Sequence, residues 1–263
     1  MATEVLIVIP TLGQRVDYLR QTLESIRNQQ VEADITVVTP ESASAVRALA
    51  HEYGAKVIDD PGSLPAAINL GVSEAGIQHR YVNWLGDDDL LTDLSLESTI
   101  QALGANPRAV VAYGSCRYID PQGKELWVSK AGKWAERILT WGPDLIPQPG
   151  MLIRKEAWDS VGGVDESLSH AFDLDLLLKL KNQGEFTPVD HVVSCFRWHP
   201  ESLTVSDRSK SLNESEEIKR RYLSPRQDKL KWLWEKPVRG ATRIAAQRLN
   251  KRAYRISAAK TSG

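Results

Sequence analysis

Residues 81–89 read YVNWLGDDD, a short apolar run that ends directly in Gly86 and three aspartates. A short apolar run bounded by a turn signal is typical of a buried strand. We therefore predict a strand over residues 81–85, with the aspartates on the turn that follows it. The position of this strand among its neighbours decides what the aspartates can do.

The residues before this strand alternate between strand patterns and helix patterns. Apolar and β-branched runs predict strands at 5–10, 34–39 and 55–60, and helical spacing predicts helices at 17–29 and 42–53. Pro65 suits the first turn of a third helix, which we expect to end near Ala75. This alternation implies βαβ units and a parallel sheet, so the run at 81–85 is the fourth strand.

A polar or turn-forming segment follows each of the four strands. Ligands bind at the carboxyl ends of the strands in such a sheet. Any one segment alone reads as an ordinary polar turn, but four at one edge predict a binding cleft. The segments are Pro10-Thr11, Thr39-Pro40-Glu41, Asp59-Asp60 and Gly86–Asp89.

The second half of the chain has a more mixed pattern. Residues 109–120 and 125–130 predict a hairpin with its turn at Gly123, and residues 186–199 predict a final pair of strands. Helices are expected at 134–141 and 172–180, with a strand leading into a helix over 150–158. From about Glu214 the sequence is helical and charged.

Length and composition restrict the class of protein. The chain has 263 residues and 42% hydrophobic content, which suits one α/β domain with an appendage. The start, MATEVLIVIP, lacks the basic segment of a signal peptide, and no apolar run approaches the roughly 18 residues of a membrane span. Cys116 and Cys195 have no CxxC partner, which favours buried thiols in a reducing compartment. We therefore expect a cytoplasmic protein.

The net charge of −1 conceals an uneven distribution. From Lys219 to the end there are fourteen Lys or Arg against two acidic residues, so the first 218 residues carry a net charge of −13. This is not the pattern of a uniformly basic nucleic-acid binder, and we expect no nucleic acid among the partners. The basic tail predicts either peripheral contact with an anionic membrane, at the inner face of the plasma membrane, or packing against the acidic body. The sequence leaves both open.

The aspartates themselves suggest a cation site. Mg²⁺ and Mn²⁺ prefer carboxylate oxygens and usually keep substrate phosphates among their ligands. Adjacent carboxylates repel one another, and a bound cation offsets that repulsion. The competing interpretation of a DDD segment is a solvated acidic turn or a helix cap.

Several longer segments resemble the family 2 glycosyltransferases of the GT-A fold, over about residues 4–205. The matching segments are the first strand and helix (IPTLGQR and DYLRQTLESIRNQ), AINLGV at 67–72, WLGDDDLLTDLSL at 84–96, QPGMLIRKEAWDSVGGVDESL at 148–168, FDLDLLLKL at 172–180 and FRWHPESLT at 196–204. The resemblance implies an α/β fold of the GT-A type, a Rossmann-like nucleotide-binding mixed sheet flanked by helices. The implied domain covers 1–212, with a donor half at about 1–105 and an acceptor half at 106–212. A basic helical extension covers 213–263.

The resemblance also implies a metal site and a catalytic base. Asp89 matches the best metal ligand, Asp87 is a second ligand, and His199 matches a histidine that completes the site. Asp173 matches the base that deprotonates the acceptor hydroxyl, although a helix cap is its competing interpretation. Asp173 and Asp175 cannot both face one side of a helix, so we expect one at the cleft and the other in a structural role. The implied cofactor is a divalent cation, Mn²⁺ or Mg²⁺.

The remaining site residues come from the strand ends, from the resemblance and from the segments expected to border the cleft. The acceptor candidates are Gln148 and Trp198. Three positions depart from the family pattern, namely Thr39-Pro40-Glu41 where an Asp is common, Ile68 where an Arg is common, and Phe172 where an acidic residue often precedes the base. The nucleotide base that is preferred therefore stays open. The expected donor-binding residues are Pro10, Thr11, Arg15, Glu41, Asp60, Asn69, Asp87, Asp88 and Arg208.

Taken together, these residues predict an inverting, metal-dependent glycosyltransferase. It would move a sugar from a nucleotide-diphosphate donor to the hydroxyl group of a saccharide, either free or linked to a lipid. Such a reaction belongs to the assembly of cell-surface polysaccharides or glycolipids. A dehydrogenase is disfavoured because no GxGxxG follows the first strand. The alternatives are a sugar nucleotidyltransferase, for which TLGQR is a poor glycine-rich loop, and a non-catalytic assembly partner of the same fold at the membrane.

Overall fold

The computed structural model describes residues 3–129, 132, 134–198 and 208–225, together with the single positions 227, 229, 232, 236, 237 and 240. Its strands are β1 (Val5–Pro10), β2 (Ala33–Thr39), β3 (Lys56–Asp59), β4 (Tyr81–Trp84), β5 (Leu90–Leu91), β6 (Ala109–Ile119), β7 (Glu125–Ser129), β8 (Leu152–Arg154) and β9 (Glu185–Arg197). Its helices are α1 (Val16–Arg27), α2 (Ser44–Glu52), α3 (Leu64–Ser73), α4 (Ser95–Ala105), α5 (Trp134–Ile138), α6 (Lys155–Val161), α7 (Phe172–Lys181) and α9 (Arg208–Arg221).

The nine strands form one mixed sheet in the order β3-β2-β1-β4-β8-β6-β9-β5, with β7 paired to β6. The first four are parallel, as the sequence predicts. β8 runs antiparallel to both β4 and β6, so the strand pairing changes from parallel to antiparallel at β8. Val8 lies opposite Trp84, and Pro10 lies opposite Val38. This register places the carboxyl ends of β1, β2 and β4 at one edge.

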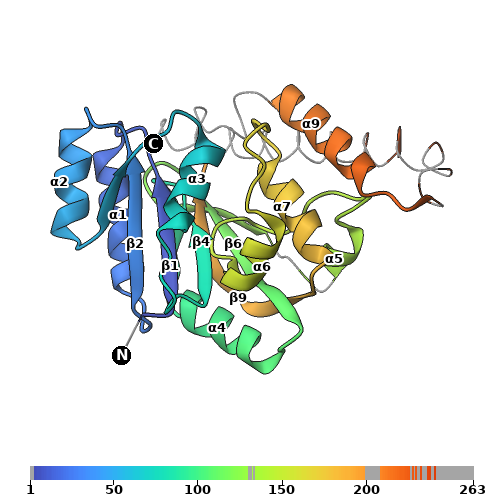
Figure 1. The fold of residues 1–263 in the computed structure, drawn as a ribbon, viewed down its shortest axis with the longest axis horizontal. Helices are drawn as coiled ribbons and strands as arrows, with labels where there is room; N and C mark the ends of the chain where they lie inside the picture. The colour runs from blue at the N-terminus through green and yellow to red at the C-terminus, as the bar shows by residue number, and fades with distance from the viewer. Residues whose placement is uncertain are drawn as a thin grey trace.

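Helices cover both faces of the sheet (Figure 1). On one face α3, α5, α6 and α7 pack against alternate strand residues such as Val8 and Val82. On the other face α1, α2 and α4 pack against the intervening residues, such as Ile7 and Ile9 of β1. Because β1 and β4 are buried on both faces, their sequences are apolar without the alternation of an exposed strand.

Most predicted elements are present, and the hairpin turns at Gly123, whose φ is 83°. The prediction of a strand pair over 186–199 is wrong. β9 is one strand that pairs parallel with β6 from Ala109 to Ile119, and shifts of register absorb its irregular middle. Asp190 and His191, in the middle of β9, are exposed on a continuous strand. Cys116 and Cys195 are buried free thiols, as predicted.

The C-terminal helix α9 packs on α7 (Figure 1). Ile218 is fully buried in the core beneath it, and Lys219 Nζ donates to the carbonyl of Gly142 at 2.7 Å. Lys219 therefore belongs to the body, although it opens the basic segment of the sequence. In the part of the chain that the structure describes, no helix is long and apolar enough to cross a membrane. Most of the basic tail lies outside that part.

Candidate active site

The three aspartates lie on the turn that connects β4 to β5. Their exposed fractions are 9% for Asp87, 9% for Asp88 and 4% for Asp89. Gly86 gives the turn its close packing, since a Cβ there would lie 2.9 Å from Asp89 Oδ2 and 3.0 Å from Asp88 Oδ1. The segment is thus a buried acidic cluster and not a solvated turn.

Residues between β1 and α1 contact the carboxylates of Asp87 and Asp88. Thr11 Oγ1 donates to Asp87 Oδ2 at 2.5 Å. Arg15 Nη1 lies 2.7 Å from Asp88 Oδ2 and 3.4 Å from Asp87 Oδ1. The Arg15 side chain is 28% exposed, so it closes the cluster on the side of the solvent. The structure therefore brings together Thr11, Arg15 and both aspartates, as the convergence of strand ends predicts.

Asp89 is the most deeply placed of the three. The main-chain N–H of Arg197 donates to its Oδ1 at 3.1 Å, and Thr22 Oγ1 donates to its carbonyl at 2.8 Å. Burial, then the charges of Asp88 and Asp87, raise the pKa of Asp89 well above its usual range, against the bond from Arg197. A positive charge at this carboxylate would relieve that cost.

Arg197 is a part of the site that sequence reasoning missed. It is 1% exposed, and its guanidinium donates to the carbonyls of Asp88 and Pro121 at 3.0 Å each and to Gln21 Oε1 at 2.8 Å. The same group lies 4.3 Å from the ring centre of Tyr18. A buried guanidinium needs such partners. An arginine at the end of an apolar strand was the signal available in the sequence.

Asp173 stands in the first turn of α7. The helix N-cap is Ala171, so the cap interpretation of Asp173 does not hold. The carboxyl accepts the N–H of Leu174 at 2.8 Å, and burial raises the pKa of Asp173 to about 6. Asp175, two residues on, is held by Tyr222 Oη at 2.9 Å and Lys179 Nζ at 2.9 Å. Asp175 therefore has the structural role that we expected for one of the pair.

Trp84 connects α7 to the aspartate cluster. Its indole lies 6.4 Å from the ring of Phe172 and 6.0 Å from that of Trp158, between centroids. Its carbonyl accepts Gln148 Nε2 at 2.7 Å. One strand residue thus joins the aspartates to the helix of Asp173 and to the predicted acceptor residue.

Other predicted residues are placed less directly. Asn69 on α3 is engaged with the loop before α7, through the main chain of Val164 and the Glu166 carboxylate. Glu41 is exposed after β2, and the main chain of Asp60 donates to Thr39. Pro10 ends β1, directly before Thr11.

Three predictions rest on residues at the end of β9 and after it. Trp198 is 5% exposed in a small apolar cluster with Leu126, which leaves little of its ring for a sugar. His199 lies outside the described residues, as does the side chain of Arg208. The acceptor, metal and donor roles of these three residues stay predictions.

The chemistry of the donor set fits a hard divalent cation. Buried carboxylate oxygens gather at Asp87–Asp89, and burial, followed by the charges of Asp88 and Asp87, raises the pKa of Asp89. Among the described residues no three His, Cys, Asp or Glu side chains form a complete ligand set. His199, outside them, is the predicted further ligand.

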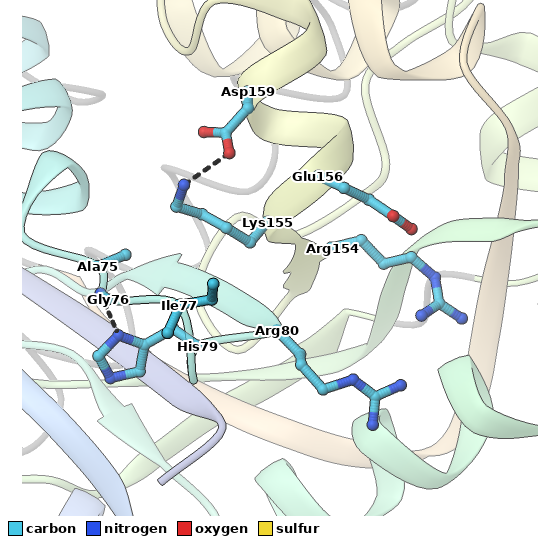
Figure 2. A pocket seen from close by; sticks show the side chains of 9 residues that line it. All are labelled: Ala75, Gly76, Ile77, His79, Arg80, Arg154, Lys155, Glu156 and Asp159. Atoms are coloured by element: carbon cyan, nitrogen blue, oxygen red, sulfur yellow. Dashed lines mark hydrogen bonds and ion pairs between the residues drawn. The ribbon is translucent and has the colours of Figure 1, made fainter. Parts of the chain in front are cut away.

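A hollow of about 500 Å³ lies at the other end of β4 from the aspartates (Figure 2). Its polar side chains are largely committed to partners within the protein. Arg154 donates to the carbonyls of Ala109 and Leu103, Lys155 pairs with Asp159 at 2.6 Å, and His79 accepts the Gly76 N–H at 2.8 Å. The residues that line this hollow do not include the aspartate cluster, so the two are separate.

Residues 6–159 match the model of the family described as Glycosyl transferase family 2. The chain belongs to this family. Family 2 membership makes it a glycosyltransferase, an enzyme that transfers a sugar from a nucleotide-sugar donor to an acceptor. The matched residues include the aspartate cluster and end before Asp173.

One relative is likewise described as a glycosyltransferase, and two solved structures share the fold. A Haemophilus influenzae protein described as an uncharacterized glycosyltransferase is 23% identical over 209 residues, which cover 76% of this chain and 70% of that protein. The crystal structure of S. aureus TarS 1-349 superposes with a TM-score of 0.60 at 14% identity, over 84% of this chain and 69% of that one. A longer S. aureus TarS structure gives a TM-score of 0.58 at 14% identity, over 83% and 42%. The GT-A fold predicted from the sequence is confirmed.

Proposed function

We propose that this family 2 enzyme is an inverting, metal-dependent glycosyltransferase that moves one sugar from a nucleotide-diphosphate donor to a hydroxyl acceptor. The observation that carries the proposal is the buried cluster Asp87–Asp89 at the carboxyl end of β4, tied to Thr11 and Arg15 of the β1 end. A parallel α/β sheet binds its ligand at this edge.

The donor would lie across the strand ends. Asp89 and Asp87, with His199, would hold Mn²⁺ or Mg²⁺, which supplies positive charge for the diphosphate as it departs. Asp88 and Asp87 would accept bonds from the ribose hydroxyls, and Arg15 would face the phosphates. The other donor contacts that we propose are Pro10, Thr11, Glu41, Asp60, Asn69 and Arg208.

Asp173 would act as the general base. With a pKa of about 6 it is mostly ionised near neutral pH, yet basic enough to accept a proton. Its carboxylate takes the proton of the acceptor hydroxyl as that oxygen forms a bond to the anomeric carbon. The bond from that carbon to the diphosphate oxygen breaks on the opposite side, and the nucleoside diphosphate leaves with the electron pair. One displacement of this kind inverts the anomeric configuration.

The acceptor would approach beside Gln148, whose amide already faces the end of β4. We propose a saccharide or lipid-linked hydroxyl in cell-surface polysaccharide or glycolipid assembly. The basic residues after Lys219 support a peripheral position on an anionic membrane surface. If so, removing residues 225–263 lowers binding to vesicles that contain anionic lipid and leaves donor hydrolysis intact. Unchanged vesicle binding would rule out the membrane role.

A thermal-shift screen tests the donor assignment. The protein is heated with UDP-, dTDP- and GDP-sugars, each with Mn²⁺, with Mg²⁺ and with chelator. We expect at least one donor to raise the Tm only when the cation is present, because a ligand that binds the folded state stabilises it. Equal stabilisation with chelator would contradict the metal dependence. A non-catalytic relative would show no stabilisation by any donor.

A further inference from the structure

The carboxylate of Glu214, on α9, closes the N-terminal end of α7. Its Oε1 accepts the N–H of Ser169 at 3.1 Å, and its Oε2 accepts those of His170 and Ala171 at 2.6 Å each. These amides are consecutive and lead directly into the helix that carries Asp173. Charge-assisted bonds of this kind are among the stronger hydrogen bonds in proteins.

Within the first turn of α7 Asp173 accepts the amide of Leu174, but the N-cap position has no such side chain. The N-cap residue of α7 is Ala171, and the cap position makes no side-chain hydrogen bond. The first amides of a helix need partners from elsewhere, and a negative charge is favoured at that end. Glu214, 43 residues later in the chain, supplies both.

α9 is fixed at several points besides Glu214. Ile218 is buried in the core, Lys219 donates to Gly142, and Tyr222 Oη donates to Asp175. α9 thus contacts α7 on both sides of Asp173 in sequence, at Ala171 through Glu214 and at Asp175 through Tyr222. The residues that match the family model end at 159, so this contact lies outside the matched segment.

We infer that Glu214 is a positioning residue for Asp173, holding the first turn of α7 so that the Asp173 carboxylate meets the acceptor hydroxyl. The inference rests on the proposed function, in which Asp173 is the base. Glu214 binds the main-chain amides of residues 169–171, which precede Asp173. It affects Asp173 by holding this main chain in place and by its negative charge.

Several charged groups set the environment of Asp173. Burial raises its pKa first, and the charge of Glu214 adds to that rise. Burial opposes ionisation of Glu214 as well, but the three amide bonds, followed by the charge of His170, outweigh it and lower the pKa of Glu214. Asp144, in the segment between α5 and β8, interacts electrostatically with Asp173 and with Lys219. Glu214 therefore stays ionised while Asp173 titrates.

The test uses the full chain with Glu214→Gln, which keeps the shape and removes the charge, and Glu214→Ala. Glu217→Gln is the matched control, because Glu217 is exposed on the same helix and pairs at the surface with Arg221 at 3.3 Å. The pKa of Asp173 is read by NMR from labelled aspartate carboxyls, with Asp173→Asn for assignment. Amide hydrogen exchange is followed over residues 169–174, relative to the core strands. Turnover and KM are measured in parallel.

In Glu214→Gln we expect the pKa of Asp173 to fall, because a nearby negative charge is removed. We also expect exchange over 169–174 to rise at least tenfold, and kcat to fall about tenfold with the donor KM nearly unchanged. Glu217→Gln should match the wild type in every readout. Unchanged titration of Asp173 and unchanged exchange in both Glu214 variants would overturn the inference. Full turnover in Asp173→Asn would instead refute the proposed base, and the titration and exchange data would still decide the role of Glu214.

Discussion

The ring of Phe172 packs 6.4 Å from the indole of Trp84, and this contact joins the two carboxylate sets of the site. Trp84 is the last residue of β4, three positions before Asp87. Phe172 is the first residue of α7, immediately before Asp173. Phe172 thus packs the helix that carries Asp173 against the strand that carries the aspartates.

Truncating this contact should affect both stability and turnover. Phe172→Ala removes a ring that is 7% exposed, and we expect a loss of about 3 kcal/mol in the free energy of unfolding. Turnover should fall as well, because Asp173 follows directly in the chain. Urea denaturation and steady-state kinetics measure both effects. Phe172→Leu is the conservative control and should keep most of the stability; an equally stable Phe172→Ala would contradict the packing role.

The charge of Arg15 should matter for the donor. Arg15→Gln removes the cation that faces Asp87 and Asp88, and we expect donor affinity to fall roughly tenfold to a hundredfold, as for a charged hydrogen bond. Titration calorimetry with the donor identified in the thermal-shift screen measures this. Arg20→Gln is the matched control on the same helix, since Arg20 pairs at the surface with Glu52 at 3.5 Å. Equal affinities for the two variants would exclude Arg15 from the donor site.

Arg197 should be needed for the turn that holds Asp88. Arg197→Met fills a similar volume but leaves the carbonyls of Asp88 and Pro121 without their buried donor. We expect about 3 kcal/mol of destabilisation, and weaker cation binding because the main chain of the aspartate turn loses its buried donor at Asp88. Arg108→Gln removes an arginine that is 81% exposed and should change neither property. A Met variant as stable as the wild type would show that the guanidinium bonds are dispensable.

The ionisation of Asp173 should oppose folding. Its pKa is about 6 in the folded chain against 3.8 for the free group, so the folded state binds this proton more tightly. The cost of ionisation is absent below pH 3.8 and fully present above pH 6. We expect Asp173→Asn to be more stable than the wild type by about 1–2 kcal/mol at pH 8, allowing for partial solvent screening, with a smaller gain at pH 5.

Asp165 offers a control of the opposite sign. Hydrogen bonds from the side chain and main chain of Ser167 lower the pKa of Asp165, so its ionised form stabilises the fold above its unfolded pKa. Asp165→Asn should therefore lose stability at pH 8.

In the wild type, kcat/KM should fall on the acid side with a midpoint near pH 6. A pH-independent gain in Asp173→Asn would contradict the assignment of the raised pKa.

The first half of the fold could be predicted from the sequence because its strands are continuous apolar runs and its helices have clear spacing. The aspartate cluster was found for the same reason, since the position of Asp87–Asp89 after a fourth strand follows from local patterns. β9 was harder to predict. Its middle holds the polar residues Asp190 and His191, and its continuity depends on pairing with β6, which is distant in the sequence.

Contacts between distant segments could not be predicted from local patterns. Arg197 reaches Asp88 across 109 positions, and Glu214 reaches Ala171 across 43. Neither spacing has a periodicity, and each depends on how β9 and α9 pack in the finished fold. The sequence carried only the weaker signal that a charged residue in an apolar strand needs buried partners.

The measurement that tests the central claim most directly is the rate of sugar transfer by Asp89→Ala and Asp173→Asn, with a donor that stabilises the wild type in Mn²⁺. Asp93→Asn, an exposed aspartate just beyond the cluster, is the control. We expect a loss of at least a hundredfold in both variants and wild-type turnover in the control, with donor binding kept in Asp173→Asn and lost in Asp89→Ala. Full turnover in Asp89→Ala and Asp173→Asn would contradict the account.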